Sequence, residues 1–121
     1  MVAPLRSLIF LGLLAACDRP LPEHEPATGG NPRSGRQLIQ HFGCGSCHSI
    51  PGVPGATATV APSLEKLKSR QFLAGRLSNT PENLQKWIRE PRAVDPKTAM
   101  PDVGLTESQA RDIAAYLYVS R

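Results

Sequence analysis

Apolar residues recur at helical spacing in several stretches of the chain, and segments rich in proline and glycine separate these stretches. The first stretch opens at Asn31-Pro32, a favourable helix start because proline suits the first helical position. It closes at Gly43, a residue type that commonly follows the last turn of a helix. Its apolar positions share one face: Leu38, Ile39 and Phe42. The pattern therefore predicts a short amphipathic helix.

Two further helices have start signals of their own. Thr80 is a good capping residue followed by a proline, and Pro91 stops the helix that begins there. Thr106 and Gln109 have the spacing of a capping box at the start of the last helix. The apolar residues after each start have helical spacing: Leu84, Trp87 and Ile88 in the first, and Ala110, Ile113, Ala114 and Leu117 in the second.

The segments between these helices are expected to be mostly irregular. Residues 49–62 and 92–104 are broken by glycine and proline. A short helix is expected within Ser63–Leu73, with Leu64 and Leu67 facing inward. No segment alternates convincingly at the period of a β-strand. The predicted class is all-α, with three to four short helices in one domain over residues 33–121.

The N-terminal residues have the layout of an export signal. Arg6 gives a basic start, residues 7–14 are apolar, and Leu14-Ala15-Ala16-Cys17 resembles the lipobox of bacterial lipoproteins. The apolar run is far shorter than the ~20 residues that a spanning helix needs. We therefore expect residues 1–16 to be a lipoprotein signal peptide and Cys17 to carry the lipid. An ordinary signal peptide that ends near a cysteine is the alternative.

Residues 17–32 are expected to be a tether between the lipid and the domain. After the cysteine the segment reads DRPLPEHEPATGGNP, which has four prolines, two glycines and almost no large apolar residue. Such a segment cannot build a core, and about 15 residues reach up to ~45 Å when extended. We interpret His24 as a solvated residue of this tether. By resemblance to enterobacterial lipoproteins, Asp18 would favour the inner membrane.

Composition narrows the function classes. The 121 residues hold 14 Lys+Arg against 10 Asp+Glu, which is only mildly basic. Without a basic run or an RNA-type aromatic pattern, nothing supports nucleic-acid binding. Aromatic residues make up only 5%, and small domains with few large apolar side chains often depend on a metal, a disulfide or a cofactor. A bound cofactor is therefore expected.

Residues 43–50 read GCGSCHSI, and this cluster indicates which cofactor. A structural zinc site needs four ligands, usually as two such pairs, and the second pair is absent. A thioredoxin-type pair belongs in a βαβ setting, which the pattern does not show. A disulfide between Cys44 and Cys47 would leave His48 unexplained. C-x-x-C-H is the c-type attachment sequence, so we predict one covalent haem c with His48 as the proximal iron ligand.

The second axial ligand is predicted by elimination. Met1 is the initiator, so Met100 is the only methionine of the mature chain, and it lies in a proline-bounded loop. A loop methionine that fills a gap in the packing is the alternative. His41 is a rival ligand, but its nearness to Cys44 makes a reach to the far haem face awkward. A thioether ligand at Met100 would stabilise ferrous iron and raise the reduction potential.

The folded part resembles a class I cytochrome c over Ser34–Arg121. GRQLIQHFGCGSCH matches the first helix and haem motif of that family, and AAYLY matches its last helix. The resemblance implies that the two helices cross at these positions: Gly35 and Ile39 in the first, Tyr116 and Leu117 in the last.

The resemblance also implies roles outside the haem motif. Pro62, in APSL, matches the proline whose carbonyl accepts a hydrogen bond from the proximal histidine and so orients the ring. Arg70 stands where mitochondrial relatives place a propionate-binding arginine. Trp87 matches a tryptophan whose indole N–H reaches a propionate. An exposed arginine and a plain core tryptophan are the alternatives.

The stretch SNTPENLQKWIREPRAVDPKTAMPDVGLT resembles one branch more closely, the cytochrome c domain fused to subunit II of certain haem–copper oxidases. The chain departs from the family pattern at Ala61, which replaces the usual glycine, and it has no tyrosine between Trp87 and Met100. It also lacks the extra Cys and His ligands of a dinuclear copper centre. The haem module alone is therefore expected.

These interpretations favour an electron carrier, not an enzyme, because two axial ligands leave no open position for a substrate. We expect a lipid-anchored monomer on the periplasmic face of a bacterial membrane, with the inner membrane favoured. The expected partners are a quinol-oxidising complex upstream and a terminal oxidase downstream. Lys86, Arg92 and Lys97 could steer docking, or be ordinary solvated charges. The alternatives are a ligand-binding or peroxidase-like haem c protein with labile Met100, and a fixed haem subunit of a respiratory complex.

Overall fold

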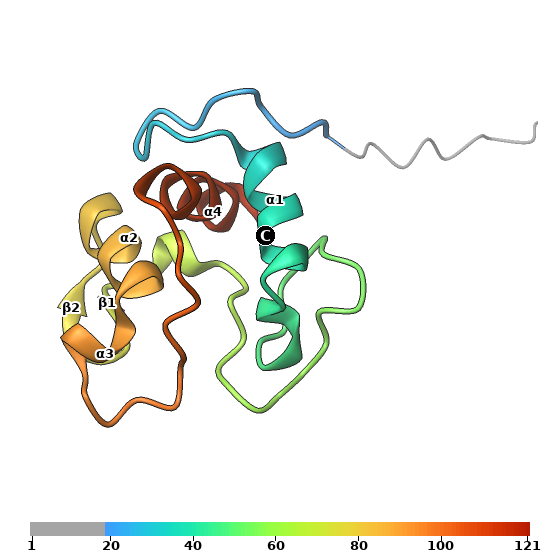
Figure 1. The fold of residues 1–121 in the computed structure, drawn as a ribbon. Helices are drawn as coiled ribbons and strands as arrows, with labels where there is room; N and C mark the ends of the chain where they lie inside the picture. Colours follow the sequence, from blue (N-terminus) through green and yellow to red (C-terminus); the bar gives the residue numbers. More distant parts are fainter. Residues whose placement is uncertain (1–18) are drawn as a thin grey trace, which may run out of the picture.

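The computed structural model describes residues 19–121, so the predicted signal peptide and the predicted lipidation at Cys17 lie outside the described residues. The elements follow the order α1, η1, η2, β1, β2, α2, α3 and α4, where η marks a 3₁₀ turn. Figure 1 shows α1 and α4 side by side, with α2, α3 and a small hairpin beyond α4. Within residues 19–121, no helix is both long and apolar enough to span a membrane.

The helix α1 (Pro32–His41) forms where the pattern predicted it. The side chain of Asn31 accepts two backbone N–H groups of the first turn, at 2.9 and 3.1 Å, which satisfies donors that have no partner inside the helix. The helix is capped at Phe42, and Gly43 follows in the left-handed region with a φ of 72°. The sequence prediction for this helix is therefore confirmed.

The helices α2 (Pro81–Arg89) and α4 (Glu107–Val119) also begin at the predicted caps. The hydroxyl of Thr80 accepts a backbone N–H of the first turn of α2 at 3.1 Å. Thr106 and Gln109 exchange reciprocal capping-box bonds at 2.9 and 3.2 Å. Because these caps are local interactions, they were visible in the sequence, and the mostly helical class is confirmed.

The short helix expected within residues 63–73 forms only as a single 3₁₀ turn, in which Leu67 is buried as expected. The 3₁₀ turn η2 (Leu67–Ser69) is followed by β1 (Phe72–Leu73), which pairs antiparallel with β2 (Leu77–Ser78). The side-chain amide of Asn79 donates to the carbonyl oxygens of Leu67 and Arg70, at 2.8 and 2.9 Å. The left-handed backbone at Lys66 limits this helix on one side, and the extended backbone at Arg70 ends it on the other.

The segment 92–104 is irregular as expected, except that α3 (Pro91–Val94) adds a single turn directly after α2. The carboxylate of Asp95 pairs with Arg76 at 3.2 Å, which joins the end of α3 to the hairpin. The N–H of Thr98 bonds to the carbonyl of Asp95 at 3.0 Å. This turn sets the path of the connection that carries Met100.

The crossing of α1 and α4 is the centre of the fold. Gly35 lies against the backbone of Asp112, and a Cβ at this position would overlap the carbonyl oxygen there. Ile39, one turn further along α1, is 1% exposed. On α4, Tyr116 and Leu117 are both buried. The crossing that the resemblance implied at these residues is therefore confirmed, and glycine is required where the two backbones meet.

Part of the segment expected to be a solvated tether is packed against the domain. Glu25 is 2% exposed, and it forms an antiparallel bridge with Gly30. Its carboxylate accepts the N–H of Thr28 at 2.7 Å and pairs with Lys68 at 3.5 Å. Gly30 lies so close to the carbonyl of Arg111 that a side chain would overlap it. The polar groups of this turn form hydrogen bonds within the turn, so residues 25–30 pack against the domain without a large apolar side chain.

Candidate functional site

The two cysteines lie on a tight turn directly after α1. The turn consists of η1 (Cys44–Ser46), which follows Gly43, and of Cys47 directly after it. The carbonyl of Cys44 accepts the N–H groups of Cys47 and His48 at 3.2 and 3.0 Å. Both thiols are free, with Cys44 half-buried and Cys47 exposed. Burial raises the pKa of the Cys44 thiol, whereas reactive redox cysteines have a lowered pKa.

The loop over residues 50–56 packs on this turn. Gly45 lies against Ala56, and an added Cβ at Gly45 would come within 2.8 Å of the Cβ of Ala56. Ile50 is 2% exposed, and its N–H bonds to the carbonyl of Ala56 at 3.0 Å. The glycine between the cysteines is therefore required by the close approach of this loop.

The imidazole of His48 is oriented by one hydrogen bond. Its Nδ1 lies 2.7 Å from the carbonyl oxygen of Pro62, so Nδ1 carries the proton and donates it. The N–H of Ala61, beside that proline, bonds to the carbonyl of Cys47 at 2.9 Å and ties the loop to the cysteine turn. The bond that the resemblance implied is therefore present, and it leaves Nε2 as the nitrogen that can bind a metal.

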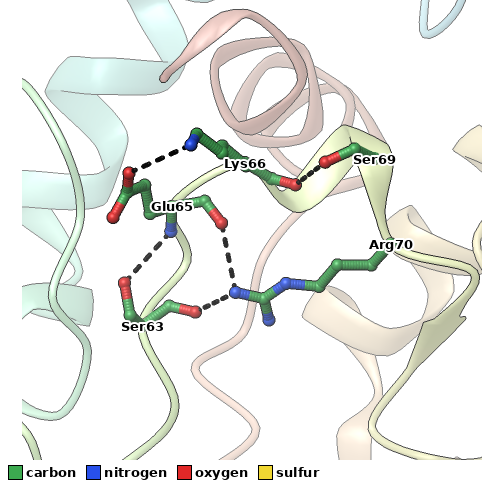
Figure 2. A network of polar contacts seen from close by, with 5 residues as sticks. All are labelled: Ser63, Glu65, Lys66, Ser69 and Arg70. Atoms are coloured by element: carbon green, nitrogen blue, oxygen red, sulfur yellow. Dashed lines mark hydrogen bonds and ion pairs between the residues drawn. The ribbon is translucent and has the colours of Figure 1, made fainter.

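Arg70 holds the loop just beyond Pro62 (Figure 2). Its guanidinium donates to the carbonyl of Ser63 and, at 3.2 Å, to the carbonyl of Glu65. The N–H of Glu65 also bonds to the hydroxyl of Ser63 at 3.2 Å, which closes a compact turn. The resemblance implied a propionate contact for Arg70. In this structure the guanidinium instead donates hydrogen bonds to the residues that follow Pro62, whose carbonyl is the hydrogen-bond acceptor of His48.

The other two predicted haem contacts, Trp87 and Met100, are both half-buried. Trp87 lies on α2, whose fully buried positions are Leu84 and Ile88, at 2% and 6% exposure. Met100 lies in the connection between α3 and α4, where its N–H bonds to the hydroxyl of Thr98 at 3.2 Å. Because neither side chain is fully enclosed by protein, both keep surface that can contact a cofactor.

The donor set on the cysteine turn fits one cofactor well. Residues 19–121 hold no group of three or more His, Cys, Asp or Glu side chains that could bind a metal ion, so a four-ligand zinc site finds no partners there. Two free thiols and an imidazole with a fixed tautomer remain, all on one turn. Thiols add to the vinyl groups of a porphyrin, and imidazole binds its iron.

Comparison with known proteins agrees with this donor set. A sequence profile described as Cytochrome c matches residues 33–119. The chain belongs to the cytochrome c family. It carries haem c covalently on Cys44 and Cys47, and it is an electron carrier rather than an enzyme. The predicted fold and cofactor are thus confirmed, while the axial ligands and the propionate contacts stay predictions.

Two curated relatives of this cytochrome c domain are both named cytochrome c oxidase subunit 2. The protein from Alkalihalophilus pseudofirmus is 33% identical over 97 residues, which cover 78% of this chain and 27% of the relative. The protein from Bacillus sp. (strain PS3) is 35% identical over 85 residues, which cover 67% of this chain and 24% of the relative. The chain therefore spans about a quarter of the length of these relatives.

One side chain supports the haem site in a way that the sequence pattern did not single out. Tyr116 was expected to contact α1 from α4, but its hydroxyl also donates to the carbonyl of Pro51 at 2.5 Å. This bond ties α4 to the loop that packs on Gly45. A buried tyrosine hydroxyl needs a partner, so the sequence indicated that some bond would exist but not which carbonyl would accept it.

Proposed function

We propose that this cytochrome c carries single electrons from a quinol-oxidising complex to a terminal oxidase, at the periplasmic face of a bacterial inner membrane. Two observations support the proposal: both relatives are named as oxidase subunits, and the residues before Cys17 resemble a lipobox. In this proposal Cys17 carries the lipid that holds the protein on the membrane as a monomer. The finer resemblance, to a class I domain of the kind fused to oxidase subunit II, belongs to the same proposal.

His48 is the proximal iron ligand in this proposal, and its hydrogen bond to Pro62 is the observation that carries it. The 2.7 Å bond places the proton on Nδ1 and keeps the lone pair of Nε2 free. A carbonyl partner also makes the imidazole a stronger donor to a metal. Arg70 supports this arrangement, because it fixes the loop directly beyond Pro62.

Met100 is the second ligand in this proposal. Its thioether is half-buried in the connection between α3 and α4 and is available as a soft donor. When bound, haem supplies a one-electron couple between ferric and ferrous iron. Trp87 and Arg70 are the proposed propionate contacts. Arg70 has five N–H donors, so it can keep its backbone bonds and still reach an anion.

The proposed docking surface for redox partners consists of the exposed cations Lys86, Arg92 and Lys97. They lie on α2, on α3 and in the connection after α3, the region that also carries Met100. Positive charge here would steer an acidic partner toward the haem and raise the association rate more than the affinity.

Stopped-flow mixing of the ferrous holoprotein with detergent-solubilised terminal oxidase tests the electron-transfer role. We expect fast oxidation that slows as ionic strength rises, since charge steering is screened by salt. Replacing both Arg92 and Lys97 with glutamate should lower the rate. The matched variant Lys66→Glu, which changes a charge on the turn before η2, should not. The proposal is wrong if the wild-type ferrous protein delivers no electrons to the oxidase.

Carbon monoxide binding tests the proposed ligand set. The Met100→Leu variant should bind carbon monoxide rapidly in the ferrous state, because it lacks the second ligand. The wild type and the control variant His41→Gln should bind it slowly, if at all. Rapid binding by the wild type at neutral pH would contradict ligation by Met100 and would favour a ligand-binding or peroxidase-like protein.

Mass spectrometry of protein extracted from membranes tests the proposed anchor. The wild type should carry acyl chains at Cys17, and the Cys17→Ser variant should lose both the added mass and the retention on membranes. Purification in mild detergent then distinguishes a free carrier from a fixed subunit. A carrier leaves the membrane alone, whereas a subunit of a respiratory complex leaves with its partners.

A further inference from the structure

A groove of about 1080 Å³ lies between the first described residues and the end of α4. Its walls come from residues 19–22, from residues 51–52, from the segment around η2, and from the last turn of α4 with the two residues after it. Among the described residues, none of the proposed haem contacts lines it. The lining combines basic and apolar side chains, which include Arg19, Leu21, Lys66, Lys68, Tyr118 and Val119.

The basic side chains of this groove are open to solvent. Lys66 and Lys68 are 72% and 57% exposed, and Arg19 is exposed as well. The carboxylate of Glu65 lies 3.9 Å from the ammonium of Lys66, but both are exposed, and such a pair contributes little. The partner of Lys68 is Glu25, whose carboxylate is buried behind the surface. The ammonium of Lys68 is therefore the charge that an approaching molecule meets.

The chain reaches this groove directly from its N-terminal side. Cys17 precedes Arg19, a residue of the groove lining, by two positions, so at most about 7 Å of extended chain joins them. The sequence alone predicted a tether with a reach of about 45 Å. That reach is not available, because residues 19–22 line the groove, Leu21 packs against the core, and the carbonyl of Leu21 accepts the Nε–H of Arg33 at 3.2 Å. A bilayer that holds the anchor must lie close to the basic groove.

We propose that the groove binds the headgroups of anionic phospholipids and holds the domain against the bilayer. This proposal rests on the membrane attachment given under the proposed function. Basic side chains around apolar ones are the chemistry that an anionic membrane surface selects. Figure 1 shows that the N-terminal segment and the loop after α3 lie at opposite ends of the molecule. Docking through the groove therefore leaves the segment with the proposed redox docking surface directed away from the bilayer.

Amine labelling of the acylated holoprotein in nanodiscs tests this proposal. One set of nanodiscs contains phosphatidylcholine alone, and the other contains phosphatidylglycerol as well, so neither lipid carries a reactive amine. Labelling of Lys66 and Lys68 should slow by about fivefold or more in the anionic nanodiscs, as expected from the attraction of each basic residue to such a surface. Lys97 should label equally in both. Salt of about 1 M, which shortens the screening length to about 3 Å, should remove the difference.

Charge reversal of Arg19 and Lys66 to glutamate should remove the protection of Lys68, and Lys97→Glu should leave it unchanged. If the protein attaches to both nanodiscs and Lys66 and Lys68 label equally in each, the headgroup site is wrong while the anchor stands. If it attaches to neither, both are wrong. Protection that requires an added membrane protein, rather than anionic lipid, would also overturn the proposal.

Discussion

Replacing Glu25 with alanine should lower the free energy of unfolding by about 2–3 kcal/mol, a large effect for a residue that the sequence places in a tether. The carboxylate accepts the N–H of Thr28 at 2.7 Å in a site that is 2% exposed. A hydrogen bond to a charged group contributes about 1.5–3 kcal/mol. The ion pair adds only about 0–1 kcal/mol, because Lys68 is more than half exposed.

Guanidinium unfolding of the holoprotein, followed by far-UV circular dichroism, measures this change. Glu25→Gln should lose about 1 kcal/mol, because its amide oxygen still accepts a hydrogen bond but carries no charge. Glu23→Ala is the matched control, since Glu23 is an exposed acid of the same segment and should change the stability little. Equal unfolding midpoints for Glu25→Ala and the wild type would refute the reasoning and would support the original prediction that this segment is a solvated tether.

The stability should also depend on pH through Glu25. Burial alone would raise the pKa of this carboxyl, but hydrogen bonds from Thr28 and Ala27 and the charge of Lys68 hold it below its ordinary value. A lowered pKa in the folded state stabilises the protein above the ordinary value of about 4.5, and this contribution is lost as the pH falls through the lowered pKa. Glu25→Gln should flatten the acid side of the stability profile. An unchanged profile would mean that the carboxyl titrates normally.

Three further substitutions test the packing, each measured by the same unfolding experiment. Gly35→Val should cost about 3 kcal/mol or prevent folding, because its side chain overlaps the carbonyl of Asp112; a stable variant would disprove the close crossing. Tyr116→Phe should cost about 1 kcal/mol, since the carbonyl of Pro51 loses its donor, and no loss would mean that water replaces it. Thr80→Ala should cost about 1 kcal/mol through the lost cap of α2; an unchanged midpoint would show that the cap is dispensable.

The predictable parts of the fold are those decided by neighbours in the sequence. Asn31, Thr80 and Thr106 cap their own helices, so a few residues suffice to place each start. The short helix expected near Leu67 is only one 3₁₀ turn long, because the chain is left-handed at Lys66 and extended at Arg70, where the amide of the distant Asn79 also binds. A two-residue strand is also too short to show any alternation. Interactions of this kind are outside the reach of a local pattern.

The candidate site divides in the same way. Cys44, Cys47 and His48 are contiguous, so their chemistry could be inferred directly from the motif. The bond from His48 to Pro62 needed the family resemblance, because it joins residues fourteen positions apart. The packed turn at Glu25 was not predicted, because the low number of apolar residues suggested a solvated segment. Composition does not reveal that the polar groups of this turn form hydrogen bonds with one another. The role of Met100 stays a prediction, because ligation requires the cofactor.

The pairing of α1 with α4 has a consequence for the order of events during biosynthesis. The N–H of Asn31 donates to the carboxylate of Asp112 at 2.8 Å across 81 positions, so the two ends of the domain close on each other. A nascent chain emerges with its N-terminus first, and α4 is therefore the last helix to arrive. Before α4 packs against α1, the cysteine turn is part of an incompletely folded chain, and an enzyme that modifies the cysteines can reach it. The fold is therefore completed only when α4, the last helix to be synthesised, packs against α1.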